Sequence, residues 1–126
     1  MFAVTRIYSD ARGESHFEDI AIPLNGAGPI GALSESLPAG SVIFREVEPA
    51  YDWDFHNVPQ RQYIILLDGQ TEIETSGGET RVFGPGEVLL VEDTTGKGHR
   101  SRNLLHARRR SIFITIPEEP AGGNTF

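Results

Sequence analysis

Two of the four histidines stand in stretches that could fix them in a functional site. His99 directly follows a Gly-Lys-Gly turn at residues 96–98, and His56 ends an aromatic stretch that begins at Tyr51. Imidazole nitrogens bind divalent metals, and near neutral pH they also act as general acids or bases. Because the chain has no cysteine, thiolate metal sites, disulfides and cysteine nucleophiles are excluded. Histidine chemistry, with metal or without it, is therefore the chemistry to consider.

Short strands joined by tight turns must position these histidines. Apolar and polar residues alternate in short segments separated by Gly, Pro, Asn and Asp, and no amphipathic helix of useful length is present. The pattern predicts strands at Ala3–Tyr8, His16–Leu24, Ile30–Leu37, Ser41–Glu48, Gln62–Leu67, Thr71–Thr75, Glu79–Phe83, Glu87–Glu92, His99–Leu104 and Arg110–Ile116. Residues 25–29 are expected to end the strand that precedes them. The predicted fold class is all-β, a jelly roll of two antiparallel sheets.

The composition fits one soluble, cytoplasmic domain. With 126 residues and a net charge of −7, the chain suits a single domain and does not suit a nucleic-acid surface. No basic leader or long apolar run is present, so neither a signal peptide nor a membrane span is expected. We expect a barrel at about residues 41–116, N-terminal strands within residues 1–40, and a frayed tail at residues 117–126.

The stretch from Gly86 to Asn103 resembles the second motif of the cupin superfamily. In order, Gly86, Glu87, Gly96, His99 and Asn103 fit that motif, while Thr94 stands where a proline is usual. The first cupin motif is matched in spacing more than in residue type. His56 and Gly69 fit it, whereas Gln62 replaces its acid, Val58 its second histidine and Ala50 its first glycine. The resemblance covers about residues 41–116 and implies a double-stranded β-helix barrel.

The resemblance implies a metal site at His56, Gln62 and His99. Two imidazoles and one oxygen donor on neighbouring strands suit a divalent Fe, Mn, Ni or Zn ion. Gln62 is a weaker donor than a carboxylate and Val58 cannot bind metal, so a reduced affinity is expected. If strict alternation holds along this strand, Asp54 joins the two histidines as a carboxylate ligand instead. A metal-free pair of hydrogen-bonded pocket histidines is the other interpretation.

Residues near these histidines are candidates for ligand binding. Trp53 lies just before His56 and could line the mouth of the barrel beside Asp54, although such an aromatic residue could equally belong to the core or a dimer contact. Arg45 could point into the barrel and hold a carboxylate, or point outward and pair with an acid. Tyr63 should face away from the pocket, because it neighbours Gln62 on a strand.

Other features are interpreted as structural. His16 is expected at the surface or in a dimer interface, and His106 is expected to be exposed. The turn before His99 lacks the leading glycine of a phosphate loop, so no nucleotide is expected. Six of the eleven basic residues lie between Lys97 and Arg110, and most should point outward and pair with acids. A homodimer is expected, with Phe2–Tyr8 pairing or packing across a two-fold axis.

The resemblance is compatible with three functions. The first is a small cupin that binds a divalent metal and acts on a small polar or carboxylate-bearing molecule. The second is a non-catalytic cupin that binds a small ligand as a sensor or storage protein. The third is a metal-free isomerase or lyase that uses His56 or His99 as a general acid or base.

Overall fold

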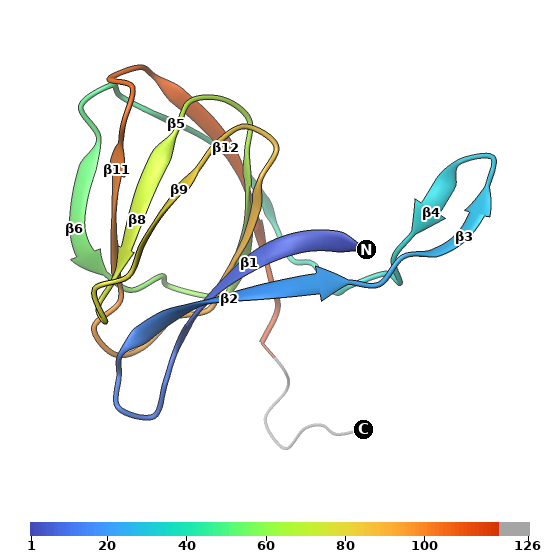
Figure 1. Ribbon diagram of the computed structural model, residues 1–126, viewed down its shortest axis with the longest axis horizontal. Helices are drawn as coiled ribbons and strands as arrows, with labels where there is room; N and C mark the ends of the chain where they lie inside the picture. Colours follow the sequence, from blue (N-terminus) through green and yellow to red (C-terminus); the bar gives the residue numbers. More distant parts are fainter. Residues whose placement is uncertain (119–126) are drawn as a thin grey trace.

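The computed structural model describes residues 1–118 as an all-β chain (Figure 1). Its strands are β1 (Phe2–Ser9), β2 (Ser15–Ile22), β3 (Asn25–Gly28), β4 (Gly31–Leu33), β5 (Val42–Val47), β6 (Asp52–His56), β7 (Gln62–Leu66), β8 (Thr71–Thr75), β9 (Thr80–Phe83), β10 (Val88–Val91), β11 (His99–Asn103) and β12 (Arg109–Thr115). The frayed tail expected from the sequence lies largely outside the described residues. Within them, no helix has the length and apolar character needed to cross a membrane.

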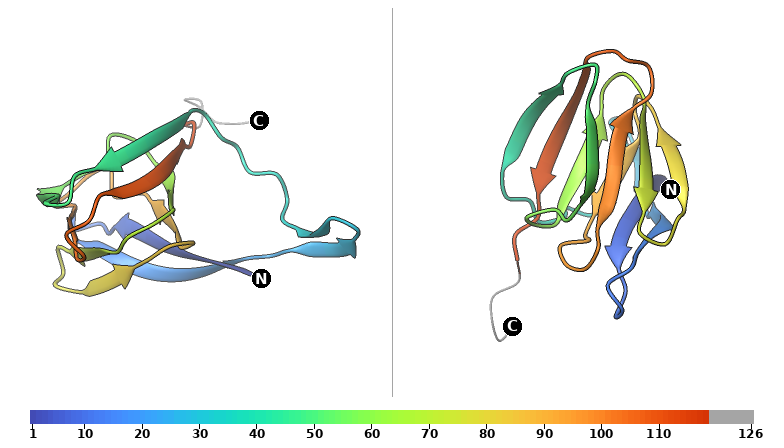
Figure 2. Two further views of the ribbon diagram at one scale, coloured as in Figure 1. Left: turned by 90° about the horizontal axis from the view of Figure 1, so that it is seen from above. Right: turned by 90° about the vertical axis from the view of Figure 1, so that its left-hand side faces the viewer.

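Two sheets form the walls of one barrel (Figure 2). The six-stranded sheet has the order β2-β1-β10-β7-β12-β5, and the four-stranded sheet has the order β6-β11-β8-β9. All neighbours in these sheets are antiparallel except β1 and β10, which run parallel. This architecture confirms the predicted all-β jelly roll.

The two central strands of the six-stranded sheet, β10 and β7, carry no charged residue and are largely apolar on both faces. On β7, Gln62, Ile64 and Leu66 point into the barrel, and Leu66 belongs to the main buried cluster with residues such as Ile7 and Leu89. Tyr63 points the other way and packs against a second cluster outside the barrel. The prediction that Tyr63 faces away from the pocket is therefore confirmed.

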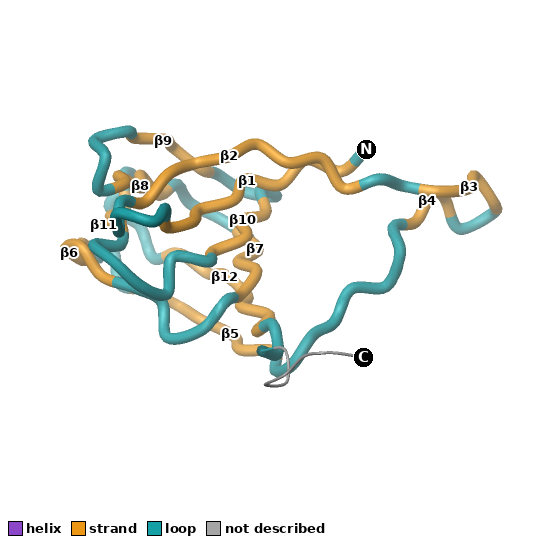
Figure 3. Tube along the Cα trace, turned by 90° about the horizontal axis from the view of Figure 1, so that it is seen from below, coloured by secondary structure: helices purple, strands orange, loops and turns teal. Residues whose placement is uncertain are grey.

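The connection between β2 and β5 differs from the prediction. Residues 25–29 were expected to end the preceding strand, and Ile30–Leu37 was expected to form the next one. Instead, Asn25–Gly28 and Gly31–Leu33 pair as a two-stranded hairpin. Gly26 and Gly31 adopt positive φ angles of 74° and 95°, which suit glycine and allow this tight hairpin. Figure 3 shows the hairpin standing well away from the barrel.

Strand β1 is an interior strand of its sheet. It pairs with β2 on one side and with β10 on the other, so its backbone groups are already used. Phe2–Tyr8 therefore has no free edge with which to pair with a second copy, so that half of the expectation is wrong, while packing of this segment across a two-fold axis stays a prediction.

Candidate functional site

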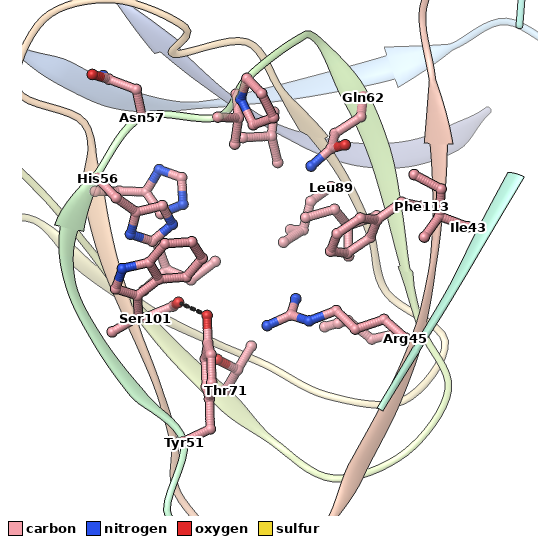
Figure 4. Close-up of a pocket in the computed structure, with 18 of the residues that line it drawn as sticks. Ile43, Arg45, Tyr51, His56, Asn57, Gln62, Thr71, Leu89, Ser101 and Phe113 are labelled. Atoms are coloured by element: carbon pink, nitrogen blue, oxygen red, sulfur yellow. Dashed lines mark hydrogen bonds between the residues drawn. The ribbon is translucent and has the colours of Figure 1, made fainter. Parts of the chain in front are cut away.

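The barrel encloses a cavity of about 340 Å³ between the two sheets (Figure 4). His56, His99 and Trp53 line it from the four-stranded sheet, and Gln62, Arg45 and Arg109 line it from the six-stranded sheet. In Figure 4, His56 and Arg45 lie on opposite sides of the opening. Such a size and such a mixture of apolar walls with a few polar groups are typical of small-molecule pockets.

His99 is held by a buried carboxylate that the sequence interpretation missed. Its Nδ1 lies 2.6 Å from Oδ2 of Asp93, and the two side chains are 5% and 0% exposed. With an ionised Asp93, which only accepts hydrogen bonds, Nδ1 donates and Nε2 is left as the nitrogen available to a ligand. The other Asp93 oxygen, Oδ1, is buried without a hydrogen-bond partner among the described residues.

The loop that carries His99 is fixed against the β1–β2 hairpin. Ser15 Oγ donates to the carbonyl oxygen of Gly98 at 2.6 Å, and the Lys97 amide donates to Gly13 O at 2.8 Å. Gly98 has a φ of 75°, and a Cβ built there would overlap the carbonyl oxygen of His56. The glycine before His99 is therefore required both by its backbone angle and by the close approach of β6.

His56 is held more loosely on the neighbouring strand. It is the cross-strand partner of His99, and their ring centroids are 4.7 Å apart. The expectation that both histidines face one cavity is thereby confirmed. Trp53 stacks on the His56 ring at 3.9 Å, and Nδ1 of His56 donates to the Asp54 carbonyl oxygen at 2.8 Å. Burial, together with the adjacent His99, lowers the pKa of His56, which favours its neutral form.

Asp54 does not form the expected two-histidine, one-carboxylate set. It is exposed, it is absent from the cavity lining, and its carboxylate accepts a hydrogen bond from the Phe55 amide. A register shift in the pairing of β6 with β11 breaks the alternation on which that expectation depended. The structure thus places Asp54 outside the cavity in which it was predicted to bind a ligand.

The donor set of the cavity fits a resident metal poorly. Gln62 and Val58 both line the cavity, at the positions where the family motif has an acid and a second histidine. Among residues 1–118, no group of three or more His, Cys, Asp or Glu side chains is placed to hold a metal ion. Two imidazoles, each with only Nε2 left to bind, and one neutral amide supply few donors and no negative charge for a dication.

Two arginines form the cationic side of the cavity. Arg45 and Arg109 lie 4.9 and 5.7 Å from the Tyr51 ring centroid, and the Tyr51 hydroxyl is 2.8 Å from Ser101 Oγ. Arg109 is only 3% exposed, and its Nε donates to Asn103 Oδ1 at 2.9 Å. Burial lowers the pKa of Arg109, and the positive charge of Arg45 lowers it further.

Within the described part of the chain, Arg45 and Arg109 pair with no carboxylate. The remaining arginines of the basic region, as expected, point outward and pair with acids: Arg100 with Asp52, Arg102 with Glu72, Arg108 with Glu46 and Glu48, and Arg110 with Asp68. Arg45 and Arg109 thus lie in a largely apolar cavity without a counter-charge from the described residues, whereas the other arginines of the basic region each have one.

Asp93 and Arg109 are the site residues that sequence reasoning missed. Asp93 lies just after β10, where an irregular turn hides which way a side chain points. Arg109 is the middle residue of a three-arginine run, and only the bounds of β12 show that it points inward while both its neighbours point outward. The alternation along Arg108, Arg109 and Arg110 was the signal that could have identified it.

His16 and His106 lie outside the cavity. His16 hydrogen-bonds through Nε2 to Asp10 Oδ2 at 2.6 Å, in the β1–β2 hairpin. This contact lowers the pKa of Asp10 to about 2. His106 is exposed, as expected, with a φ of 43° in the turn before β12.

Comparisons with curated proteins identify two relatives from Diaporthe leptostromiformis. The chain is 32% identical over 87 residues to phomopsin biosynthesis cluster protein C', which covers 68% of this chain and 44% of the relative. It is 31% identical over 86 residues to phomopsin biosynthesis cluster protein D, covering 67% of this chain and 44% of the relative. The chain thus spans less than half the length of the curated relatives it matches. No family model matches it.

Comparison with solved structures identifies a cupin-superfamily sugar phosphate isomerase from Silicibacter pomeroyi. The TM-score is 0.50 at 18% identity, over 84% of this chain and 60% of that structure. Likeness at this identity shows the fold and nothing more. The chain therefore has the cupin fold, as the motif resemblance implied.

Proposed function

We propose that this chain, a small cupin by its fold, binds a carboxylate-bearing organic molecule in its barrel and transfers a proton on it without a metal. The observation that carries the proposal is the buried Asp93–His99 contact of 2.6 Å on one wall, opposite two unpaired arginines on the other. His99 acts as the acid–base group, and Arg45 with Arg109 bind the anion.

The arginines support an anionic ligand. An uncompensated cation in an apolar cavity is costly, and Arg109 is almost fully buried beside Arg45. A carboxylate bound between these two guanidinium groups would supply the missing charge and form charge-assisted hydrogen bonds. Tyr51 lies against both guanidinium groups and limits their movement, so the cationic wall is formed before a ligand arrives.

The Asp93–His99 pair supports proton transfer. A carboxylate behind Nδ1 fixes the tautomer of the ring and stabilises the imidazolium that forms when Nε2 accepts a proton. An isomerisation needs only that His99 accept a proton from one carbon of the ligand and return it to another, so no further reactant is required. His56, kept neutral by burial, lies close enough to hydrogen-bond the same ligand.

The names of the two relatives support a role in a biosynthetic pathway. Both are named as proteins of the phomopsin biosynthesis cluster, and the matched region includes less than half of each. We infer that this chain acts on an organic acid within a biosynthetic sequence.

A second candidate is a non-catalytic cupin that binds the same kind of anion. The stacking of Trp53 on His56 and the hydrogen bond from His56 Nδ1 to the backbone favour it, because they occupy that histidine without any ligand. Both candidates bind an organic anion, but only the first converts it to a product.

Hydrogen–deuterium exchange distinguishes them. Tag-free protein dialysed against a chelator is incubated in D₂O with pyruvate, 2-oxobutyrate and 2-oxoglutarate, and exchange at the carbon next to the carbonyl is followed by proton NMR. We expect the protein to accelerate exchange in at least one of these acids, and His99→Gln to reduce the rate about 100-fold or more. His106→Gln, which changes a histidine outside the cavity, should leave the rate unchanged.

Other results would overturn the proposal in defined ways. Exchange that appears only after Zn²⁺, Fe²⁺ or Mn²⁺ is added would show that the protein uses a metal. Binding of the acids without accelerated exchange would favour the non-catalytic candidate. Equal exchange rates for the wild type and His99→Gln would show that His99 is not the acid–base group.

A further inference from the structure

The outer face of the six-stranded sheet is apolar across its width. We use "outer face" for the side chains on β2, β1, β10, β7, β12 and β5 that point away from the cavity. Its apolar members are Ile20, Val4, Val88, Leu90, Tyr63, Ile65, Ile112, Ile114, Phe44 and Val42. By the same register, the ion pair of Arg6 and Glu18 lies on this face beside Leu90, and Arg110 and Glu46 lie at its border. A sheet that is apolar on both sides is expected where both sides are covered.

The chain itself covers only part of this face. Val4 and Leu90 are buried by their neighbours, at 4% and 9% exposure. At the β5 end, however, Phe44 is 80% exposed and Val42 is 57% exposed. β5 is also an edge strand, so one side of its backbone has no partner within the described residues. Large exposed apolar groups that adjoin a buried cluster mark an interaction surface.

The long connection from β2 to β5 extends on the same side of the sheet. We call residues 23–41 the arm; Figure 3 shows it on the opposite side of the six-stranded sheet from β6, β8, β9 and β11. It carries a single charged residue, Glu35, while Ile30 is 80% exposed and Leu33 is 53% exposed. A lone two-stranded hairpin is marginal in water, and connections are typically about 4–6 residues long.

We propose that the outer face packs against the outer face of a second copy of this chain, with the arm of each copy lying across the other. The features that favour this partner are self-complementary. A two-fold interface needs the same patch on both subunits, and here an apolar face and an almost uncharged arm occur on one chain and on one side. The chain carries a net charge of −7, so an uncharged centre is what two like-charged copies need.

The edge of the face also suits an interface. Arg6 pairs with Glu18 and Glu92, and Arg61 also pairs with Glu92, so these charges are neutralised within the chain at the border of the apolar centre. Interfaces commonly have such a polar rim around an apolar core. Six strands about 4.8 Å apart give a face about 24 Å wide, and a stable interface takes about 800 Å² from each partner, a square of about 28 Å. The arm would supply the interface area that the face alone lacks.

Sedimentation equilibrium of the full chain tests the proposal. We expect a mass about twice the 13.9 kDa of one chain at 10–100 µM, on the scale of ordinary assays. Phe44→Asp and Ile30→Asp should each weaken the dimer at least about tenfold, because each places a charge at an apolar contact. Both side chains are 80% exposed in the single chain, so neither change should disturb folding.

Val82→Asp is the matched control. Val82 is 50% exposed on β9 of the four-stranded sheet, away from the outer face, and its replacement should leave the dimer unchanged. A wild-type mass of 13.9 kDa at 100 µM would overturn the proposal. A dimer unaffected by Phe44→Asp would remove the outer face from the interface, and one unaffected by Ile30→Asp would remove the arm. Because these positions lie outside the cavity, failure here leaves the proposed function untouched.

Discussion

The two histidine-bearing strands of the cavity are held in different ways. On β11, His99 is buried, hydrogen-bonded to Asp93, and preceded by a loop fixed to the β1–β2 hairpin. On β6, His56 comes from the edge strand of its sheet, stacks on a half-exposed Trp53, and pairs with β11 through a register shift. One imidazole is rigidly oriented and the other has room to adjust.

This difference assigns the two rings different tasks. Proton transfer requires a base whose nitrogen stays in place, and the Asp93 carboxylate provides that for His99. An adaptable ring beside an aromatic side chain at the mouth suits contact with ligands of varied shape, and this fits His56.

Gly98→Ala should have the largest effect on the fold. A Cβ at this position would overlap the backbone of His56, and a φ of 75° is unfavourable for alanine. We expect unfolding to become easier by about 3 kcal/mol or more, measured by urea denaturation. Gly86→Ala is the control: its φ is 85°, but nothing lies within 4 Å of the added Cβ. It should cost only about 1 kcal/mol, and equal losses would contradict the close packing described for the His99 loop.

Asp93→Asn should abolish most acid–base activity while the chain stays folded. The amide has the same shape, but it can donate to Nδ1 and so favours the wrong tautomer of His99. We expect the exchange rate to fall about 100-fold to 10,000-fold, with carboxylate binding retained. Asp54→Asn, which alters a carboxylate outside the cavity lining, should change neither quantity. A rate that survives Asp93→Asn would show that orientation by Asp93 is not needed.

Arg109→Gln should weaken carboxylate binding by about 10-fold to 100-fold, the range for losing a charge-assisted hydrogen bond. Isothermal titration with the same acids measures this change. The neighbouring Arg110→Gln is the control, since that arginine pairs with Asp68 at the surface. If both variants bind equally well, the cationic wall of the cavity is not the anion site.

Acid should destabilise the fold in part through His56. Its native pKa lies below the ordinary value of 6.5, so the unfolded chain takes up a proton first as the pH falls. The stability contributed by neutral His56 is therefore complete above pH 6.5 and is lost as the pH falls through the lower native value. His56→Gln should flatten this part of a stability-against-pH curve. A stability-against-pH curve that is the same for His56→Gln and the wild type would show that another group causes the loss of stability in acid.

Much of the scaffold followed from alternation and glycine placement. Gly96 and Gly98 indicated a tight turn that fixes the position of His99. Because neighbouring strand residues point to opposite faces, Gln62 and Tyr63 were predicted to lie on opposite faces of β7. These signals are local, so they can be read from the sequence. They predicted most strands of the barrel but not β6, whose residues looked irregular in sequence. The shared cavity of the two histidines was instead implied by the spacing of the cupin motifs.

The remaining features depend on long-range packing. Asp93 reaches His99 because a turn folds back, and Arg109 is buried because it lies on the cavity side of β12, in phase with Ser111 and Phe113. The hairpin of the arm was misread because Asn and Gly within residues 25–29 are equally typical of turns and of short hairpins. Such residues can be interpreted only after neighbouring strands are placed.

The central claim is that an organic anion binds between the arginines and His99 without a metal. Isothermal titration of chelator-dialysed, tag-free protein with malonate and with the uncharged malonamide tests it most directly, with the metal content of the same sample measured by elemental analysis. The account predicts that malonate binds, that malonamide binds at least about tenfold more weakly, and that added Zn²⁺, Fe²⁺ or Mn²⁺ changes neither result. Malonate binding that appears only when metal is restored would contradict it.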